Sequence, residues 1–411
     1  MSDESIRTLS TTCCISGGGP AGLMLGYLLA RAGIEVIVLE KHADFLRDFR
    51  GDTIHPSTLE LMHQLGLLDE LLQIPHQRAE RLHAEIAGQS LTLADFTRLP
   101  VRCKFIAFMP QWNFLNFLAD KARQWPCFRL IQSAKVCQLL SENGRVCGVQ
   151  ASSTEGSLHI RAQLVIGTDG RHSTVRRLAA LTSRSFGAPR DVLWMKLAKH
   201  PDDPGWSMGH TGPRQNFIMI DRGDYWQCGY SIEKGSFDSL KQAGLEKFLL
   251  KIADAAPFEA ERLQTLTDWD CVRLLSIRID RLERWAKPGV LCIGDAAHAM
   301  SPIGGVGVNL AIQDAVATAN IIVPPLRRHS LTLQDLLRVQ KRRSFPTWAT
   351  QYLQIKMTRR RQGRNARRRS SNATLMTRVA NSRWLPLLFG RIIGLGFRRE
   401  KPAHYLLRAG K

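Results

Sequence analysis

Three closely spaced glycines near the start of the chain, followed by one acid, are the residues with the clearest chemistry. Gly17, Gly19 and Gly22 fit the spacing G-x-G-x-x-G, and Glu40 follows the last of them by eighteen residues. In this pattern the first glycine permits a tight turn, the second lets a pyrophosphate approach the backbone, and the third lets a helix pack on a strand. The free N–H groups of the helix then face the anion. The expected chemistry is dinucleotide binding.

The segments around these glycines have the order that such a site requires. Residues 11–16 are β-prone, residues 20–32 have helical apolar spacing, and residues 35–39 form an almost continuous apolar strand. Glu40 closes that strand, where a carboxylate binds both ribose hydroxyls and repels a 2′-phosphate. The stretch does not distinguish NAD from FAD. We expect the turn to contact the cofactor through Gly17, Gly19, Pro20, Ala21 and Gly22.

The chain is long enough for more than one structural unit, since it has 411 residues and is 44% hydrophobic. Residues 56–72 predict two short helices broken at Gly66, and residues 128–166 predict strands with a turn at 143–144. Residues 186–282 read as strands separated by turns. The apolar strand at 290–294 then restores the earlier pattern. This order predicts a discontinuous α/β nucleotide-binding domain with a mostly antiparallel sheet inserted in it.

Two distant segments resemble further signatures of one family. VIGTDGRHSTVR (165–176) resembles the DG motif, and GVLCIGDAAHAMSPIGGVGVNLAIQDA (289–315) resembles the GD motif, of the FAD-dependent aromatic hydroxylases related to para-hydroxybenzoate hydroxylase. With the glycine turn these motifs span residues 11–326 in the family's order. The resemblance implies a class A flavoprotein monooxygenase with FAD as its cofactor.

The GD segment has a physical reason to bind a flavin. Its strand delivers Asp295 at the carboxyl end, where open parallel sheets bind ligands, although a simple helix N-cap is the alternative role. Pro302, Gly305 and Gly307 let bare backbone approach a flat ring. A helix expected from about Val308 would stabilise negative charge there. The resemblance places Asp295 on the ribityl and phosphate region and adds Asn309 to the cofactor contacts.

Other cofactor residues are carried over from the resemblance alone. It implies that Asp169 bridges towards the pyrophosphate and that Arg176 braces the DG motif. A capped helix start and a solvated arginine are the corresponding structural alternatives. Arg50 matches an arginine that contacts the FAD phosphates and guides flavin movement in relatives, and Gln111 matches a polar residue at a helix start that contacts the cofactor.

The resemblance also divides the chain into units. The expected FAD-binding domain is Rossmann-like and discontinuous, the substrate sheet is inserted, and a helical extension follows. The boundaries are 1–81, 101–185 and 285–330 for the three parts of the FAD-binding domain, 82–100 and 186–284 for the substrate strands and sheet, and 331–411 for the basic helical C-terminal region.

Relatives of this kind reduce FAD with NADPH or NADH and use O2, through a flavin C4a-hydroperoxide, to hydroxylate an aromatic, quinol or polyketide-like molecule. Such a site must exclude water. Trp194, Phe217, Met219, Trp226 and Tyr230 are candidate pocket residues, with an ordinary core role as the alternative. His210, His55 or a tyrosine are equal candidates for a base, so the catalytic residue is unknown. A flavin reductase of prenyl or polycyclic substrates and a non-enzymatic flavin-carrying membrane adaptor are the alternative functions.

The net charge of +21 lies almost entirely at the C-terminal end, where residues 326–411 hold 22 Lys and Arg and two acids. This tail favours peripheral contact with an anionic membrane. Nucleic acid is an unlikely partner, because aromatic and basic residues do not alternate as a stacking platform. No secretory signal or spanning segment is evident, and nine scattered cysteines give no metal-site spacing. We expect a cytoplasmic protein, with peripheral membrane association as an option.

Overall fold

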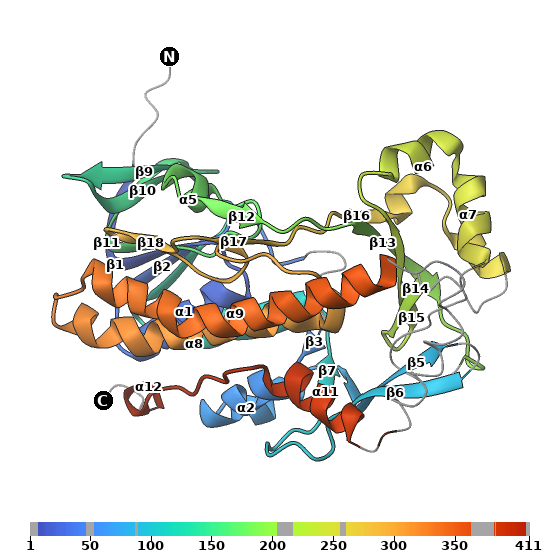
Figure 1. Ribbon diagram of the computed structural model, residues 1–411. Coiled ribbons are helices and arrows are strands. Elements are labelled where there is room, and N and C mark those ends of the chain that lie inside the picture. The colour runs from blue at the N-terminus through green and yellow to red at the C-terminus, as the bar shows by residue number, and fades with distance from the viewer. Residues whose placement is uncertain are drawn as a thin grey trace.

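A parallel sheet forms the centre of the computed structural model, which describes residues 7–46, 53–86, 89–203, 217–254, 260–362, 382 and 384–407 (Figure 1). The central strands follow the order β18-β19-β11-β1-β2-β8, and β10 and β9 extend the sheet from β11. Their bounds are β1 Arg7–Ser16, β2 Val36–Leu39, β8 Phe128–Ile131, β9 Lys135–Glu142, β10 Arg145–Ser153, β11 Gly156–Gly167, β18 Ala286–Lys287 and β19 Val290–Cys292.

The strands that carry the three motifs are neighbours in this sheet. β1 pairs in parallel with β2 on one side and with β11 on the other, and β11 pairs in parallel with β19. The last residues of these four strands are buried, because helices cover the sheet and the strands are apolar on both faces. The segments that follow β1, β11 and β19 therefore leave the sheet at one edge, as the sequence predicts.

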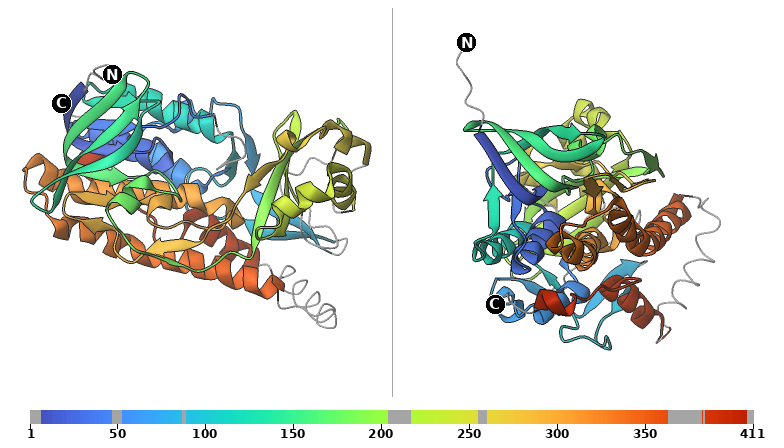
Figure 2. Two further views of the ribbon diagram at one scale, coloured as in Figure 1. Left: turned by 90° about the horizontal axis from the view of Figure 1, so that it is seen from above. Right: turned by 90° about the vertical axis from the view of Figure 1, so that its left-hand side faces the viewer.

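A layer of helices covers one side of the sheet (Figure 2). α1 (Pro20–Arg31) packs against α8 (Val306–Arg327) and α4 (Gln111–Arg123), and α9 (Leu333–Gln362) packs along α8. α1 begins with proline in its first turn and ends at Ala32 before Gly33, which has a positive φ of 75°. The two short helices predicted around Gly66 are α2 (Pro56–Gln64) and α3 (Leu68–Leu71).

The helical stretch 303–327, which includes α8, is long and apolar enough to span a membrane, but 67% of its apolar part is buried inside the protein. It packs between α1 and α9, so its apolar composition reflects the core of the molecule.

The second unit is a four-stranded antiparallel sheet with helices on its outer face. The strand order is β14-β15-β13-β16, with bounds β13 Arg190–Ala198, β14 Phe217–Asp221, β15 Tyr225–Glu233 and β16 Arg273–Leu275. The prediction of strands throughout 186–282 is wrong for the part between β15 and β16. That part holds α6 (Phe237–Ala243), α7 (Leu245–Ala253) and two 3-10 turns, η1 (Ala260–Thr265) and η2 (Trp269–Cys271). α7 is amphipathic, and it buries Phe248 and Ile252 against the sheet.

Shorter elements connect the two units. β3 (Thr53–Ile54), β7 (Ile106–Phe108) and β4 (Gln77–Ala79) form one small sheet, and the hairpin of β5 (Arg81–Ile86) and β6 (Gln89–Asp95) contacts α11 (Leu385–Leu395). The remaining elements are α5 Thr174–Leu178, β12 Ser183–Ser185, β17 Asp280–Leu282, η3 Gly294–Ala296, η4 Ile303–Gly305 and α12 His404–Leu407.

Candidate functional site

The glycine turn has one open position between two closed ones. A Cβ atom on Gly17 would lie 2.6 Å from the carbonyl oxygen of Thr168, and one on Gly22 would lie 2.0 Å from the carbonyl oxygen of Gly17. Gly17 also has a φ of +111°, which disfavours any side chain. A Cβ on Gly19, in contrast, would meet nothing within 4 Å. Packing explains the first and third glycines, and the bare backbone at Gly19 is a cradle that fits a pyrophosphate.

Glu40 lies directly against this turn. One of its carboxylate oxygens accepts a hydrogen bond from the backbone N–H of Gly18 at 2.9 Å, and the other accepts from the N–H of His42 at 3.1 Å. The residue is buried at the end of β2. The spacing therefore brings the acid to the glycine turn, where its carboxylate also fixes the local backbone.

The carboxylate of Asp169 caps α5. It accepts hydrogen bonds from the backbone N–H groups of Thr174 and Val175, at 2.7 and 3.1 Å, and from the hydroxyl of Ser173. Burial raises the pKa of Asp169, although these hydrogen bonds act in the opposite direction. The side chain of Asp169 thus caps the start of a helix, which is the structural alternative given above. The DG segment contacts the glycine turn through the backbone of Thr168 and Asp169.

Arg176 joins the DG and GD segments. Its buried guanidinium lies 3.4 Å from the carboxylate of Asp280, and it donates to the carbonyl oxygens of Ala296 and Arg171, at 3.5 and 2.9 Å. The bracing role expected of Arg176 matches these contacts. Asp295 is only partly exposed and lies at 3.8 Å from the guanidinium of Arg171.

The GD segment also approaches the first helix. A Cβ atom on Gly294 would lie 3.3 Å from the Cβ of Ala21, which is in the first turn of α1. Gly294 has a φ of +60°, so a side chain would be strained as well as crowded there. The three segments that carry Gly17, Asp169 and Asp295 are therefore contiguous, which is the arrangement that one shared cofactor requires.

The loop before α8 is made of backbone in conformations that favour glycine. Gly304 and Gly305 have φ values of +79° and +62°, and a Cβ on Gly305 would lie 2.3 Å from the hydroxyl of Thr53. A Cβ on Gly307 would meet nothing within 4 Å, and Pro302 is exposed. The helix begins at Val306, two residues earlier than expected.

The side chain of Asn309 makes hydrogen bonds to the neighbouring segment, residues 53–58. Its oxygen accepts from the N–H of His55 at 2.9 Å and from the hydroxyl of Thr58 at 2.7 Å, and its nitrogen donates to the carbonyl oxygen of Thr53 at 3.1 Å. Asn309 thus fixes β3 and α2 beside the loop. Gln111 is the first residue of α4 and is half-buried, and Arg50 lies outside the described residues.

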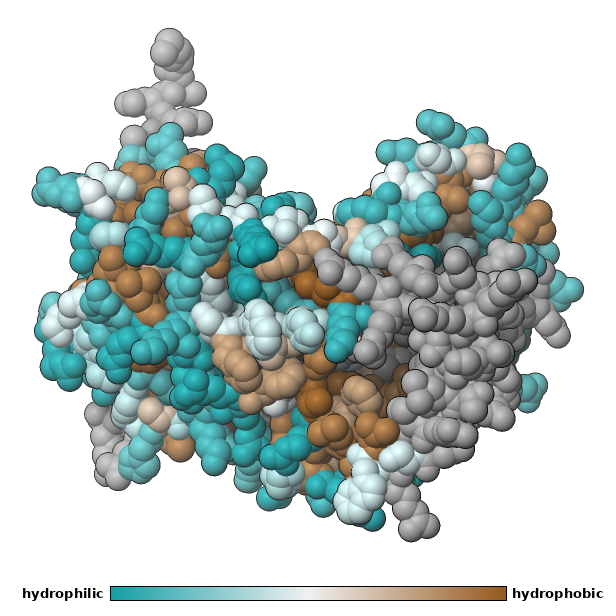
Figure 3. Space-filling view, in the orientation of Figure 1, coloured by the Kyte–Doolittle hydropathy of each residue, from teal (hydrophilic) through white to brown (hydrophobic). Residues whose placement is uncertain are grey.

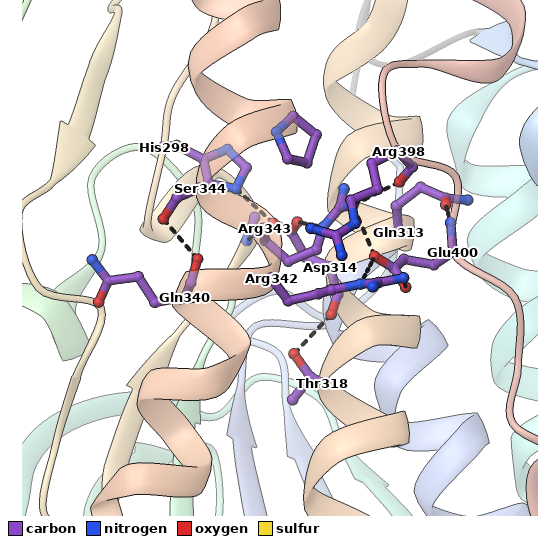
Figure 4. Close-up of polar contacts among 12 residues, drawn as sticks. His298, Gln313, Asp314, Thr318, Gln340, Arg342, Arg343, Ser344, Arg398 and Glu400 are labelled. Atoms are coloured by element: carbon purple, nitrogen blue, oxygen red, sulfur yellow. Dashed lines mark hydrogen bonds and ion pairs between the residues drawn. The ribbon is translucent and has the colours of Figure 1, made fainter.

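A buried polar network behind the GD segment was not predicted. Asp314 of α8 is fully buried, and its carboxylate lies 2.5 Å from Nε2 of His298 and 2.7 Å from the guanidinium of Arg343 on α9 (Figure 4). The same carboxylate accepts from the N–H of Gly294 at 3.1 Å. Burial raises the pKa of Asp314, but the contacts with His298 and Arg343 outweigh it and leave that pKa lowered. The network fixes the backbone immediately before Asp295.

The inserted sheet has two apolar faces with different partners. Phe217, Met219 and Trp226 belong to the core beneath α6 and α7, and Tyr230 packs on its edge. The ordinary core role is therefore confirmed for these residues. Trp194 faces the opposite side, within an inner core shared with β7, α11 and the residues just before β17, Ile277 and Ile279. Its indole packs against Gly229, and its buried N–H finds no partner among the described residues.

Comparison with known proteins agrees with this geometry. A family profile described as an FAD binding domain matches residues 10–337. The chain belongs to the FAD-dependent aromatic hydroxylases. This hydroxylase is 33% identical to a 6-methylpretetramide 4-monooxygenase of Streptomyces rimosus, over 85% of this chain and 84% of that protein. It is 22% identical to a para-nitrophenol 4-monooxygenase of a Pseudomonas strain, over 80% and 82% of the two chains.

The fold of the hydroxylase is also found in solved structures. The p-nitrophenol 4-monooxygenase of Pseudomonas putida DLL-E4 superimposes with a TM-score of 0.78 at 19% identity, covering 94% of this chain and 99% of that one. The hydroxylase is therefore an FAD enzyme of the monooxygenase type, as the three motifs predict.

Of the two histidines considered as a catalytic base, His55 is buried beside Gly305, whereas His210 lies outside the described residues.

Proposed function

We propose that this hydroxylase uses NADPH or NADH and O2 to hydroxylate an aromatic, polycyclic small molecule of the polyketide type. The observation that carries the proposal is the apolar inner core between the inserted sheet and the FAD-binding unit, where the buried indole N–H of Trp194 has no partner among the described residues. The 6-methylpretetramide 4-monooxygenase, to which this chain is 33% identical, supports the same substrate class.

The proposed cofactor contacts follow from the geometry of the turn and the loops. The backbone around Gly19 and Pro20 would bind the pyrophosphate, Glu40 would bind the adenosine ribose, and the segment at Asp295 would face the ribityl chain. The loop from Pro302 to Gly307 would lie against the flavin ring, with the start of α8 behind it. FAD, when bound, supplies the oxygen-transfer chemistry, and the protein binds, orients and excludes water.

The substrate class is proposed from the apolar composition of this core and its single polar group among the described side chains, the Trp194 N–H. An apolar wall stabilises a flat polycyclic molecule by removing its surface from water. A single buried donor such as the Trp194 N–H would then orient that molecule through a carbonyl or phenolic oxygen. This arrangement favours a substrate with several fused rings and few exposed polar groups.

The test is a reduction screen on the purified, FAD-loaded protein. We expect NADPH or NADH to reduce the flavin slowly alone and much faster with polycyclic phenols, quinols or polyketides. If simple monocyclic phenols accelerate reduction and fused-ring compounds do not, the substrate class is wrong. If no compound accelerates reduction, the flavin-carrying adaptor is favoured instead. Reduction of a carbon–carbon double bond without O2 uptake would favour the reductase.

We also propose that the division into three FAD-binding segments, two substrate segments and a C-terminal extension reflects separate roles in a cytoplasmic enzyme. The discontinuous unit would hold the cofactor, and the segments 82–100 and 186–284 would close over the substrate. The neighbouring strand order of the three motifs and the separate apolar cores support this division.

A peripheral membrane contact is the second candidate function, and exposed aromatic side chains favour it. Phe345, Trp348 and Tyr352 follow one side of α9 and are 52%, 49% and 49% exposed. A cavity of about 540 Å³ next to this row is lined by Arg184 and Arg281, among other residues. Hydrophobic surface also gathers over α11 on the same face (Figure 3). Aromatic rings beside arginines match the interface of an anionic bilayer.

Sedimentation with vesicles tests this contact. The protein should bind phosphatidylglycerol vesicles more tightly than phosphatidylcholine vesicles, and Trp348→Ser should weaken binding. The control variant Trp269→Ser changes a tryptophan on the separate α6–α7 side. Equal binding by wild type and Trp348→Ser, or no preference for the anionic lipid, would contradict the proposal.

A further inference from the structure

Two arginines face each other across the short sheet formed by β12 and β17, which lies beside α9 (Figure 1). Arg184 and Arg281 are directly opposite in the antiparallel register, so their side chains leave the same face of the sheet. Both guanidinium groups lie over the ring of Phe186, at 5.7 and 5.3 Å from its centroid. Like charges that face each other on a sheet are destabilising, so this pairing lowers the stability of the free protein.

Neither guanidinium of this arginine pair has an acidic partner. Within the part of the chain that the structure describes, Arg184 and Arg281 form no ion pair. Asp280 precedes Arg281 on the strand, but it points to the opposite face and binds Arg176 and Arg278 there. Burial and the charge of Arg184 both lower the pKa of Arg281. The two cations therefore lie side by side without a counter-charge between them.

The cavity of about 540 Å³ beside the arginine pair has room for a small ligand. Its aromatic lining consists of Trp285, Phe345 and Trp348. Two glutamines of α9 hold its walls together. Gln340 donates to the carbonyl oxygen of Glu283 at 2.8 Å and accepts from the N–H of Trp285 at 3.0 Å, and Gln351 donates to the carbonyl oxygen of Asp280 at 2.8 Å. Because the walls are fixed by these bonds, little ordering is needed when a ligand binds.

One acid also lines the cavity. Glu283 is exposed, and its carboxylate accepts a hydrogen bond from the hydroxyl of Thr182 at 3.2 Å. With two arginines and one glutamate the lining keeps a net positive charge. The lining thus combines a cationic pair with aromatic walls, which suits an anion that carries an apolar part.

We propose that this cavity binds a phosphate ester, with the phosphate between the guanidinium groups of Arg184 and Arg281 and the ester substituents against Phe345 and Trp348. Guanidinium groups match phosphate oxygens in geometry and charge. An anion between the two arginines would also remove their mutual repulsion, so part of the stability lost in the free protein returns on binding.

The surroundings of the cavity favour an anionic phospholipid as the source of the ester. The exposed rings of Phe345 and Trp348 continue along α9 to Tyr352, outside the cavity. A headgroup phosphate in the cavity would place these rings at the level of the lipid glycerol and acyl chains. None of the lining residues belongs to the glycine turn or to the DG and GD motifs. The inference rests on the proposed membrane contact only for the source of the ester.

A charge-matched pair of variants separates this site from diffuse attraction to an anionic surface. In sedimentation of the FAD-loaded protein with phosphatidylglycerol vesicles, Arg184→Gln and Arg281→Gln should raise the apparent Kd by about three- to tenfold. Arg284→Gln removes the same charge from an exposed position that does not line the cavity, and it should raise the Kd less than about twofold. Thermal unfolding should show that Arg184→Gln keeps its stability, because Arg184 is exposed and the substitution relieves a repulsion.

A soluble probe separates the phosphate site from its source. Glycerol 3-phosphate should raise the unfolding temperature of wild type and Arg284→Gln, but not that of Arg184→Gln. Equal behaviour of Arg184→Gln and Arg284→Gln in both assays would overturn the site, even if vesicle binding and its dependence on Trp348 persist. If glycerol 3-phosphate distinguishes these variants and no vesicle binds, the phosphate-ester site is supported with a soluble source, and only the membrane contact fails.

Discussion

Nε2 of His298 lies 2.5 Å from the carboxylate of Asp314, and both side chains are almost completely buried. The same carboxylate binds Arg343 on α9, so a single acid connects the GD segment to the layer of helices. Arg343 in turn contacts Glu400 at 3.3 Å near the C-terminal end. Through Arg343, Asp314 therefore links the GD segment to α9 and to Glu400 near the C-terminal end.

Asp314→Asn should destabilise the protein by about 1–3 kcal/mol, because it removes the carboxylate nearest to the buried guanidinium of Arg343 and leaves only Glu400, at 3.3 Å, as its counter-charge. Urea unfolding of the apoprotein measures this loss. Arg338→Gln is the control, since Arg338 is 68% exposed and its pair with Asp335 contributes less than about 1 kcal/mol. The lowered pKa of Asp314 means that its contribution is present above about pH 4 and is lost as the pH falls further. Equal stability of Asp314→Asn and wild type would contradict this role.

Gly19→Val separates folding from cofactor binding. Because a Cβ at Gly19 meets nothing within 4 Å, the apoprotein should keep its stability, whereas the Kd of FAD should rise by more than about tenfold. Gly22→Ala should mainly affect folding. It should destabilise the apoprotein by about 1–3 kcal/mol or more, because its Cβ would lie 2.0 Å from a carbonyl oxygen. FAD titration and thermal unfolding check both. Normal FAD affinity in Gly19→Val would show that the pyrophosphate lies elsewhere.

Arg176→Met should weaken FAD binding and destabilise the apoprotein by about 1–3 kcal/mol, since the brace between the DG and GD segments is lost. The loss is limited because Arg278 also binds Asp280, at 2.6 Å. Arg177→Met, one residue later and exposed, is the matched control. The expectation fails if both variants bind FAD with wild-type affinity.

Trp194→Phe should change the stability of the free protein by less than about 1 kcal/mol, because the lost indole N–H has no partner among the described residues. It should raise the KM for a substrate that carries an oxygen acceptor by about three- to tenfold. Flavin reduction without substrate should stay unchanged. An unaltered KM would remove Trp194 from substrate recognition.

The neutral state of His55 predicts a specific pH dependence. Its pKa is lowered to about 4 by burial, and the groups that contact it, Asn309, Gly305 and Ile393, are uncharged. A lowered folded-state pKa gives stability that is fully present above about pH 6.5 and is lost as the pH falls towards 4, by about 3 kcal/mol in total. His55→Asn should lose this slope. Parallel pH profiles for the two proteins would contradict the burial of a neutral ring.

Much of the cofactor unit follows from local patterns in the sequence. The glycine spacing, the apolar strands and the acid at Glu40 predict β1, α1 and β2 within a few residues, because each depends on neighbours in the chain. The motifs at Asp169 and Asp295 meet because they follow parallel strands that are adjacent in the sheet. The order of the strands and motifs along the chain was enough to predict that these two motifs meet.

Side-chain contacts between segments that are distant in sequence could not be predicted as well from the sequence. The resemblance places Asn309 at the cofactor, and this stays a prediction; that its side chain holds β3 and α2 could not be predicted, since only the fold brings Thr53 and Thr58 to it. The apolar spacing of LEKFLLKIA could have predicted α7, but the aromatic strands around it favoured a continuous sheet. The link from Asp314 to Arg343 depends on the packing of α8 against α9, which no local pattern specifies.

The most direct test of the account is isotopic. The FAD-loaded enzyme, supplied with NADPH or NADH and a fused-ring phenolic compound that accelerates flavin reduction, is incubated under ¹⁸O₂, and the product is analysed by mass spectrometry. The account predicts one ¹⁸O atom in the product, with loss of turnover in Gly19→Val. A product without ¹⁸O, formed with the flavin bound and reduced, would contradict a monooxygenase.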